Sequence, residues 1–373
     1  MKIYIVGVAG HPNFGDELIM KNWVLWLRHK YPSAEIWIDV PNPTILTTIF
    51  KDYNLHITNA LWRLTWDFPE SSTLEKLLHY VEDKICHLGT PNIDISLLSL
   101  RDIDIFHIVG GGYINNIWKN NIGILLSGLI IKKNYDCKLY VTGNGFLPLD
   151  LENLSMLKSL LLECDYCESR DMVGADLLEI KHGFDDAYLM ADHPVNLNTN
   201  INIPDIMVCI QSDLNNENTF SNLINCVAER LLEHANKNLI IGYIEAIPGG
   251  DRIAFEKLLE LVPGIKFISA AEAILYGLPI KHSQIWYTTR FHHHLVASYY
   301  GCKGVALGIK DGYYDIKHQS IIDNGSGWSY KSVSEDRLPD PSIDTEWSTK
   351  LKVANKQKNL LAEYLYSQYS DIL

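Results

Sequence analysis

The chain has 373 residues, which favours two domains over one, because domains usually contain about 100 to 200 residues. Hydrophobic residues make up 47% of it and charged residues 21%, which is ordinary for a globular protein and excludes a disordered or fibrous chain. Its 32 Lys and Arg against 45 Asp and Glu give a net charge of -13, which opposes binding to nucleic acid or to an anionic membrane surface. An anionic substrate would therefore need a few local cations.

The N-terminus leads directly into a strand pattern. Residues 1–8, MKIYIVGV, lack the basic region and the cleavage site of a signal peptide, so we expect a cytoplasmic protein. The longest apolar stretch, residues 122–131, is much shorter than the roughly 20 residues that cross a bilayer. It predicts a buried helix, and we expect at most peripheral contact with the inner face of the membrane.

The seven cysteines are an odd number scattered along a chain without a secretion signal, which predicts reduced thiols. Cys164 and Cys167 form one CxxC pair, which could serve redox chemistry or half of a zinc site. No second pair follows, so we favour two buried thiols. No other spacing is typical of metal ligands, and we predict no required metal ion.

Hydrophobic runs alternate with amphipathic stretches along most of the chain, as in strands and helices arranged around parallel sheets. Residues 55–100 are rich in Trp, Leu and charged residues, and we expect them to be mostly helical. We expect a further helix over residues 17–30. The strands predicted in this half are residues 2–6, 35–40, 105–109, 138–142 and 166–169. Together they predict a Rossmann-like domain over residues 1–192.

Asn and Pro cluster without periodicity at residues 192–204, which predicts an exposed connection between domains. The alternation then restarts and predicts a second Rossmann-like domain over residues 205–340. Its predicted strands are residues 206–211, 239–244, 265–269, 285–289 and 304–307, and its predicted helices are residues 220–236, residues 252–261 and one that starts at His293. An amphipathic helix at residues 345–369 would let residues 341–373 pack back on the first domain. The predicted fold class is α/β, with two doubly wound domains.

The loop after the first strand, GVAGHPNFGDE, is rich in glycine and occupies residues 7–17. Ligands of such sheets bind beyond the carboxyl ends of the strands, where glycines let the backbone approach and a helix N-terminus attracts anions. Its glycines do not match GxGxxG, which weakens a nicotinamide-binding interpretation of Asp39. A tight turn with Asp16 as the helix cap is the structural alternative.

Three further loops follow predicted strands. Two contain Gly110-Gly111-Gly112 and Gly143-Asn144-Gly145, and the third is Ser169-Arg170-Asp171, in which Asp171 suits a helix cap. We expect these loops to line the same crevice. Turn geometry alone is a slightly better explanation for each glycine loop by itself, and a surface ion pair is an equally good explanation for Arg170. The candidate cleft residues are Gly10, Asn13, Gly15, Gly111, Gly112, Gly143 and Gly145.

The fifth loop, in QIWYTTRFHHHLVASYYG, places Arg290 and His292 between an apolar strand and an amphipathic helix. Arginine binds a carboxylate or phosphate through two contacts, and histidine transfers protons near neutral pH. We expect His293 and His294 to pack or cap rather than to act. Farther on, the segment YDIK could contribute Lys317 as one more cation, although a lysine in a surface loop is usually only solvated.

Taken in order, these loops resemble the polysaccharide pyruvyltransferase family. An N-terminal G-x-x-G-x-x-N-x-G-D-E segment is followed by a triple-glycine loop, a G-x-G loop, an S-R-D element, an R-x-H element and a Y-x-x-K element. The resemblance covers roughly residues 1–325. The chain departs from the pattern in two places, because Gly301-Cys302-Lys303 replaces a G-x-P sequence and extra residues at 311–313 precede Lys317.

The resemblance implies a GT-B-like fold with the two domains facing across a cleft, and phosphoenolpyruvate as donor of a pyruvyl group to a saccharide, which forms a ketal. Arg170, Arg290 and Lys317 would hold the donor. The second domain would be the donor side and the first domain the acceptor side. His292 would act as acid or phosphate partner and Asp16 as base. Phosphoenolpyruvate would be a co-substrate, with no separate cofactor, and the acceptor would belong to a cell-surface polysaccharide or its lipid-linked precursor.

Two other functions fit the same loops. A GT-B glycosyltransferase could place the diphosphate of a nucleotide sugar on the helix after Arg290, since fold does not fix function. A non-catalytic saccharide-binding protein could use some of the 20 Tyr and 9 Trp to stack on sugars, although most of these will lie in the core. The sequence does not indicate the oligomeric state.

Overall fold

A computed structural model of the chain describes residues 1–69, 73–189, 202–212, 217–309 and 314–367. The chain divides into two compact units, and each is described by itself. The first unit contains Met1–His11, Ile19–Ala191 and Lys358–Leu373, and the second contains Pro12–Leu18 and Asp192–Gln357. Most of the predicted connection at residues 192–204 lies outside the described residues, as do residues 311–313 and 368–369.

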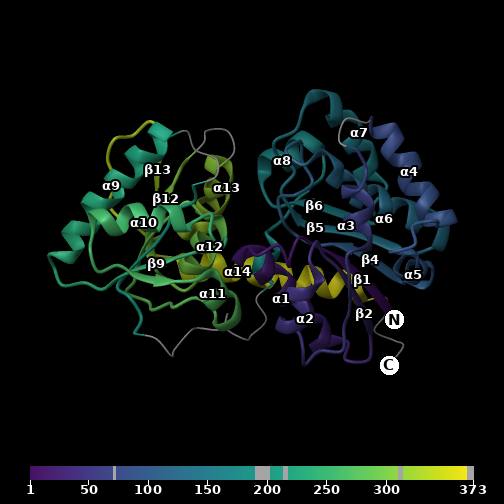
Figure 1. The fold of residues 1–373 in the computed structure, drawn as a ribbon, viewed down its shortest axis with the longest axis horizontal. Helices are drawn as coiled ribbons and strands as arrows, with labels where there is room; N and C mark the ends of the chain where they lie inside the picture. Colours follow the sequence, from purple (N-terminus) through teal and green to yellow (C-terminus); the bar gives the residue numbers. More distant parts are fainter. Residues whose placement is uncertain (70–72, 190–201, 213–216, 310–313, 368–373) are drawn as a thin grey trace. The chain divides into compact units, whose positions relative to one another are not determined.

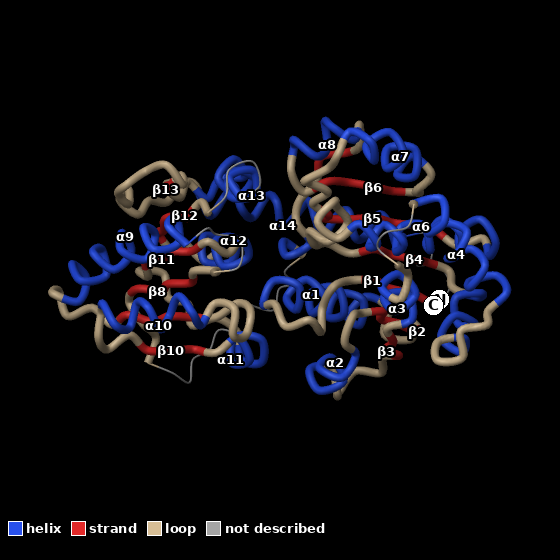
Figure 2. Tube along the Cα trace, turned by 45° about the horizontal axis from the view of Figure 1, so that its top comes forward, coloured by secondary structure: helices blue, strands red, loops and turns tan. Residues whose placement is uncertain are grey.

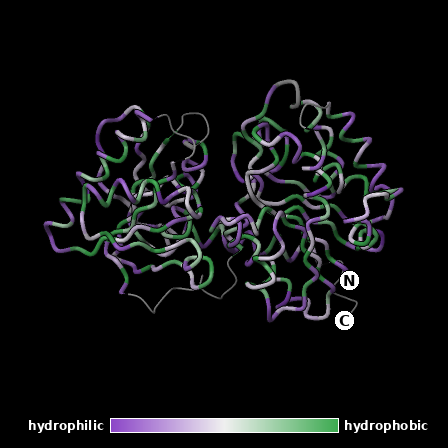
Figure 3. Tube along the Cα trace, in the orientation of Figure 1, coloured by the Kyte–Doolittle hydropathy of each residue, from purple (hydrophilic) through white to green (hydrophobic). Residues whose placement is uncertain are grey.

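The first unit is built on a parallel sheet with the strand order of a Rossmann fold. Among the described residues, seven strands follow the order β3-β2-β1-β4-β5-β6-β7 (Figure 2). They are β1 (Lys2–Val6), β2 (Glu35–Asp39), β3 (His56–Thr58), β4 (Ile105–Ile108), β5 (Lys138–Asn144), β6 (Tyr166–Ser169) and β7 (Lys181–His182). Central strands such as β4 are buried along their whole length, which explains why most of their residues are apolar (Figure 3).

The helices of the first unit connect these strands. They are α1 (Phe14–Lys30), α2 (Pro43–Ile49), α3 (Ala60–Trp66), α4 (Leu74–His87), α5 (Asp94–Leu98), α6 (Ile122–Tyr135), α7 (Leu151–Leu162) and α8 (Met172–Leu178), with short 3-10 turns η1 (Ser99–Asp102), η2 (Lys119–Asn121) and η3 (Asp186–Tyr188). The apolar helix α6 is buried as predicted and packs on β4 and β5. Gly128 permits this approach, since a β-carbon there would lie 2.8 Å from Leu139.

The second unit repeats the topology of the first. Among the described residues, six parallel strands follow the order β10-β9-β8-β11-β12-β13. Figure 1 labels β9, and Figure 2 labels the other strands of this sheet. They are β8 (Ile206–Cys209), β9 (Ile241–Ile244), β10 (Lys266–Ile268), β11 (Ile285–Thr288), β12 (Lys303–Leu307) and β13 (Ser329–Lys331). The predicted α/β class with two doubly wound Rossmann-like sheets is therefore confirmed.

The helices of the second unit are α9 (Glu217–Ala235), α10 (Arg252–Leu261), α11 (Ala270–Tyr276), α12 (Phe291–Tyr299) and α13 (Tyr314–Ile321), followed by the π-helical turn η4 (Ile322–Ser326). Helix α13 corrects one prediction. Lys317 lies in this helix and is half-buried, whereas the sequence analysis placed it in a surface loop. No helix in the described stretches has both the length and the apolar character that crossing a bilayer requires.

The last helix, α14 (Trp347–Tyr366), belongs to both units, because the chain from Lys358 onward groups with the first. The Nζ atom of Lys358 bonds the carboxylates of Glu168 and Asp186 and, at 2.8 Å, the carbonyl of Phe184. All three charged side chains are buried. Burial alone would lower the pKa of Lys358, but the two carboxylates raise it above its ordinary value.

Candidate active site

Residues 12–18 group with the second unit although the glycine-rich loop starts in the first. The Phe14 amide donates to the carbonyl of Ala246, 3.0 Å away, at the loop that follows β9. The Asn13 side chain donates to Asp16 at 2.6 Å, and its oxygen accepts from the Gly15 amide at 3.3 Å. Asn13 therefore shapes the first turn of α1.

Gly15 lies directly against His292. A β-carbon at position 15 would be 1.8 Å from Nδ1 of His292 and 2.5 Å from Cε1. Both distances are too short for non-bonded atoms, so the present geometry requires glycine. His292 is half-buried in the first turn of α12. The N-terminal glycine loop and the R-x-H element, which were predicted to share a site, therefore meet within one unit.

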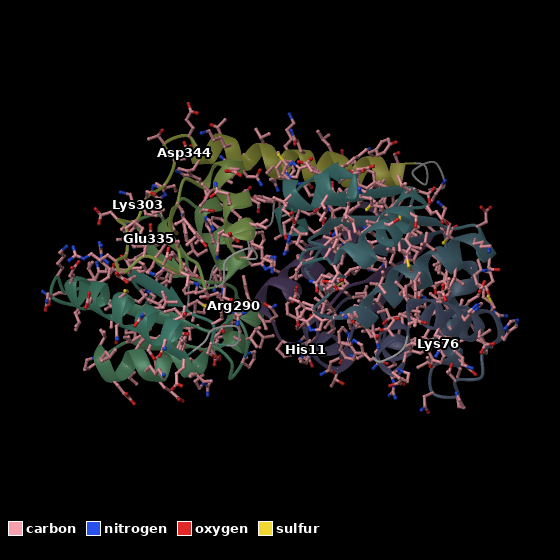
Figure 4. The ribbon with its side chains drawn as sticks, turned by 90° about the horizontal axis from the view of Figure 1, so that it is seen from above. His11, Lys76, Arg290, Lys303, Glu335 and Asp344 are labelled. Atoms are coloured by element: carbon pink, nitrogen blue, oxygen red, sulfur yellow. The ribbon has the colours of Figure 1, made fainter. Side chains whose placement is uncertain are left out.

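Arg290 is the residue that precedes α12, and its guanidinium is held by a carboxylate (Figure 4 labels Arg290). Its Nε donates to Asp251 at 3.2 Å, and one Nη nitrogen forms a second contact with the same carboxylate. Asp251 is fully buried and also accepts from the amides of Ala246 and Ile247 at 2.8 and 3.1 Å. Asp251 therefore fixes the plane of the guanidinium.

Two buried histidines link α12 to α13. Nε2 of His318 lies 3.2 Å from the carbonyl of Thr289 and must donate, so its Nδ1 accepts from Nδ1 of His294 at 3.1 Å. Nε2 of His294 then accepts from the hydroxyl of Ser326 at 2.9 Å. Burial lowers the pKa of both rings, that of His318 to about 4, so both imidazoles are neutral at pH 7 and keep these hydrogen bonds. It ties the helix of Lys317 to the residue before Arg290.

His293 is fully buried and packs against two aromatic rings. Its ring centre lies 5.1 Å from that of Phe14 and 5.7 Å from that of Trp286. Neither ring nitrogen has a hydrogen-bond partner in the described part of the chain, and burial lowers the pKa of His293 to about 3. The imidazole therefore behaves as a packed neutral ring, as expected for His293 from the sequence.

The glycine loops of the first unit surround the carboxylate of Asp186. Its Oδ2 accepts from the amide of Gly110 and the hydroxyl of Thr142, both at 2.7 Å, and from the indole of Trp23 at 2.8 Å. Gly143 has a φ of 58°, and a β-carbon there would lie 2.6 Å from this carboxylate. The glycine is thus required by close approach to Asp186.

The other predicted cleft glycines have local structural reasons. Gly111 has a φ of 153°, and its carbonyl accepts from the amide of Gly145 at 2.8 Å. The carbonyl of Gly112 accepts from Asn115 at 2.9 Å. A β-carbon on Gly10, whose φ is 81°, would lie 2.2 Å from the carbonyl of Asn42. These contacts set the loop shapes, and their part in ligand binding stays a prediction.

Arg170 is buried in the first unit. One Nη nitrogen donates to the buried carboxylate of Asp185 at 2.8 Å, and a β-carbon on Gly145 would lie 2.9 Å from Nε. The predicted cap on the next helix is confirmed, because Asp171 accepts from the amide of Gly174 at 2.7 Å. Arg170 thus forms an ion pair, but a buried one and not the surface pair of the alternative, and donor binding by Arg170 stays a prediction.

The predicted residues therefore fall into two groups. Those of the second unit are Asn13, Gly15, Asp16, Arg290, His292 and Lys317; those of the first are Gly10, Gly111, Gly112, Gly143, Gly145 and Arg170. In the described residues, no cluster of three or more His, Cys, Asp or Glu side chains could hold a metal ion. All seven cysteines are free, and burial raises the pKa of Cys164 to about 12.

A comparison with protein families identifies the family of the chain. The family described as polysaccharide pyruvyl transferase matches residues 13–311. The chain belongs to the polysaccharide pyruvyl transferase family. The match begins at Asn13 and includes Arg290 and His292, whereas Gly10 and Lys317 lie outside it. A comparison with curated proteins finds no significant match.

Solved structures show that this family member has a GT-B fold. A UDP-N-acetylglucosamine 2-epimerase is similar with a TM-score of 0.59 and 14% identity, over 99% of this chain and 95% of that one. A UDP-GlcNAc 2-epimerase from Neisseria meningitidis, bound to UDP-GlcNAc, has a TM-score of 0.54 and 10% identity, with coverage of 99% and 93%. A glycosyltransferase from Rickettsia africae has a TM-score of 0.50 and 14% identity, with coverage of 96% and 93%.

Sequence reasoning missed the acidic partners of both candidate arginines. Asp251 precedes α10 and Asp185 precedes η3, and each lies in a short loop without an apolar pattern. An acidic residue before a helix is usually read as a cap, and Asp185 does bond the Ala187 amide at 2.8 Å. No sequence signal pairs Asp251 with Arg290, because that pairing depends on the tertiary structure.

Proposed function

We propose that this member of the family transfers the pyruvyl group of phosphoenolpyruvate to two hydroxyls of a sugar and forms a cyclic ketal. The acceptor would be a cell-surface polysaccharide or its lipid-linked precursor. The observation that carries the proposal is the contact of Gly15 with His292, because it joins two elements of the matched family region next to Arg290. The protein would act in the cytoplasm or at the inner face of the membrane.

Arg290 is proposed to bind the phosphate or the carboxylate of the donor. Asp251 holds the guanidinium through Nε and one Nη nitrogen, which fixes its orientation before the donor arrives. A preorganised cation loses less entropy on binding than a flexible one. The hydrogen bonds of His318 to His294 and to the carbonyl of Thr289 hold α13, which carries Lys317, to the residue before Arg290. Lys317 and Arg170 are proposed as further donor contacts.

His292 is proposed as the acid of the reaction. It would give a proton to the methylene carbon of phosphoenolpyruvate while the oxygen of a sugar hydroxyl bonds to the neighbouring enol carbon. The proton of that hydroxyl would pass to Asp16, which lies next to Gly15 at the start of α1. A second hydroxyl would then displace phosphate, which leaves with the proton of that hydroxyl. No metal or separate cofactor is needed for this balance of atoms.

The test is an assay with donor and acceptor supplied together and separately. We expect release of inorganic phosphate only when phosphoenolpyruvate and a sugar are both present, with a pyruvyl-ketal mass gain on the sugar. A screen of lipid-linked and nitrophenyl sugars by mass spectrometry would identify the acceptor. Phosphate release without a modified sugar would contradict the proposal.

A glycosyltransferase activity is the second candidate, because a structurally similar glycosyltransferase and a UDP-GlcNAc-bound epimerase share the fold. Calorimetry separates the two. Binding of UDP-GlcNAc without any binding of phosphoenolpyruvate would favour the second candidate. Sugar binding with neither donor bound nor phosphate released would instead indicate a non-catalytic saccharide-binding protein.

A further inference from the structure

The two most exposed tryptophans among the described residues both form hydrogen bonds with Asn121. Trp66, at the end of α3, is 50% exposed, and Trp118, in the loop after β4, is 48% exposed. The indole nitrogen of Trp66 donates to Oδ1 of Asn121 at 3.0 Å, and the Asn121 amide donates to the carbonyl of Trp118 at 3.0 Å. Asn121 therefore brings Trp66 and Trp118, which are far apart in the sequence, close together in the first unit.

A buried aromatic layer supports this pair. Trp62 is fully buried, and its ring centre lies 5.2 Å from that of Trp66 in an edge-to-face arrangement and 5.5 Å from that of Tyr113. The indole nitrogen of Trp62 donates to the carbonyl of Gly7 at 3.0 Å, at the start of the N-terminal glycine loop. Trp66 is therefore anchored through Trp62 to the carboxyl end of β1, which pairs with β4.

The loop that carries Trp118 is held at several points. Asn115 donates to Gly112 at 2.9 Å and accepts from the amide of Ile117 at 2.9 Å, and the amide of Asn116 donates to the carbonyl of Pro148 at 3.0 Å. On the other side, Asn120 donates to the carbonyl of Phe68 at 2.8 Å. A ligand that stacks on this loop would not have to order it, which favours binding.

We propose that Trp66 and Trp118 form a stacking platform for a sugar ring of the acceptor. Tryptophan offers a large, rigid, amphipathic surface that loses little entropy on contact. The carboxamides of Asn115, Asn120 and Asn121 hold the loop, so the indole rings themselves are the contact surface. Membership of a family that is named for polysaccharides makes a sugar ring the ligand that we assign to them. The platform follows the triple-glycine loop at the carboxyl end of β4, where ligands of such sheets bind. Its assignment to the acceptor rests on the proposed function.

The platform can be tested directly by fluorine NMR of the full-length protein labelled with 5-fluorotryptophan. Trp66→Phe and Trp118→Phe assign the two resonances. We expect at least one of methyl β-galactoside, methyl β-glucoside and methyl N-acetyl-β-glucosaminide to shift both resonances, and phosphoenolpyruvate alone to shift neither. Failure of all three sugars to shift either resonance at their solubility limit would overturn the proposal.

Kinetics provide the second measurement. Trp118→Ala should raise the KM for the acceptor roughly tenfold, the loss expected for one aromatic stacking contact, and leave the KM for phosphoenolpyruvate unchanged. Tyr276→Ala is the matched control, because Tyr276 is an aromatic residue of the second unit that is 54% exposed. If Trp118→Ala and the wild type have the same KM for the acceptor, the platform is wrong. The proposed pyruvyl transfer would not be affected by that result.

Two further outcomes separate the possibilities. Sugar-induced shifts in a protein that releases no phosphate would support the platform and refute the proposed function. Shifts caused by phosphatidylglycerol vesicles, with none caused by the sugars, would identify a lipid contact instead and overturn the platform. The exposed Ile117 beside Trp118 makes this comparison necessary.

Discussion

The α-carbon of Gly15 lies against the imidazole of His292, so closely that a β-carbon at position 15 would be 1.8 Å from Nδ1. Gly15 belongs to the first turn of α1 and His292 to the first turn of α12. Because Gly15 has no β-carbon, the imidazole of His292, a candidate proton donor, can take this position. This contact joins the N-terminal glycine loop to the R-x-H element, and it leads to the first prediction.

Gly15→Ala should displace the imidazole of His292 and lower the rate of pyruvyl transfer about 100-fold, because a shift of about 1 Å in a reacting group has an effect of this size. Gly250→Ala is the control, since the nearest atom to a β-carbon there is 3.6 Å away, an ordinary contact in the same unit. Turnover numbers and melting temperatures of both variants provide the check. A fully active Gly15→Ala protein would mean that His292 takes no part in the reaction.

Arg290→Ala should mainly weaken donor binding. It removes a charge-assisted contact that contributes about 1.5 to 3 kcal/mol, so the KM for phosphoenolpyruvate should rise roughly 10- to 100-fold. It also leaves the buried carboxylate of Asp251 without its cation, so stability should fall.

Arg252→Ala controls for that second effect. Arg252 donates to the buried carboxylate of Glu245 at 3.1 Å in the same unit. It should lower stability without changing donor affinity. Similar KM values for both variants would show that Arg290 has a structural role alone.

The sequence predicts the central strands and the edge strand β10 but not the edge strands β3, β7 and β13. The strands β1, β4, β8 and β11 consist mostly of apolar residues because neighbouring elements cover both faces of the sheet, and a mostly apolar segment can be recognised in the sequence. The strands β3 and β7 have two or three residues each and include exposed histidines, so no run marks them. Their pairing depends on an existing neighbour in the sheet.

The candidate site divides in the same way. Glycine loops and the R-x-H element are visible because they follow apolar strands in a fixed order, and family membership supports that order. The carboxylates that hold Arg170 and Arg290 are not visible, because a charge pair forms between loops that only the folded sheet brings together. Lys317 was misplaced because α13 is short and has no marked apolar face.

Lys358→Met should destabilise the first unit by about 3 to 5 kcal/mol, since it leaves the buried carboxylates of Glu168 and Asp186 without their cation. Lys356→Met is the control, because Lys356 is exposed on the same helix. Denaturant unfolding of both variants, followed by tryptophan fluorescence, measures the difference. Equal unfolding midpoints would show that the C-terminal helix does not depend on this ion pair.

Asp39 should make stability depend on pH. The side chain accepts from the hydroxyl of Tyr4 at 2.6 Å and the amide of Leu61 at 2.8 Å, so Asp39 is a structural residue and not a ribose ligand. Burial raises its pKa to about 6, and the folded protein binds the proton more tightly than the unfolded chain. This contribution is complete below about pH 4 and is lost as the pH rises through about 6.

Asp39→Asn removes that contribution. The free energy of unfolding of the wild type, relative to this variant, should therefore decrease between about pH 4 and pH 7. Urea unfolding of both proteins across this range gives the comparison. Parallel curves would indicate that Asp39 keeps an ordinary pKa in the folded protein.

His292→Gln should affect turnover more than donor binding, unlike Arg290→Ala, because it keeps a hydrogen-bonding side chain but loses the proton that can be transferred. Turnover should fall by about two to four orders of magnitude, the usual contribution of an acid or base in the transition state. His234→Gln is the control, because His234 is a histidine of the same unit whose Nε2 bonds the hydroxyl of Tyr287 at 2.9 Å. It should leave turnover close to the wild-type value. Steady-state rates and calorimetry with phosphoenolpyruvate separate binding from chemistry in each protein. If His292→Gln and Arg290→Ala both cause small and equal losses, the loop from Arg290 to His292 is structural and the proposed mechanism is wrong.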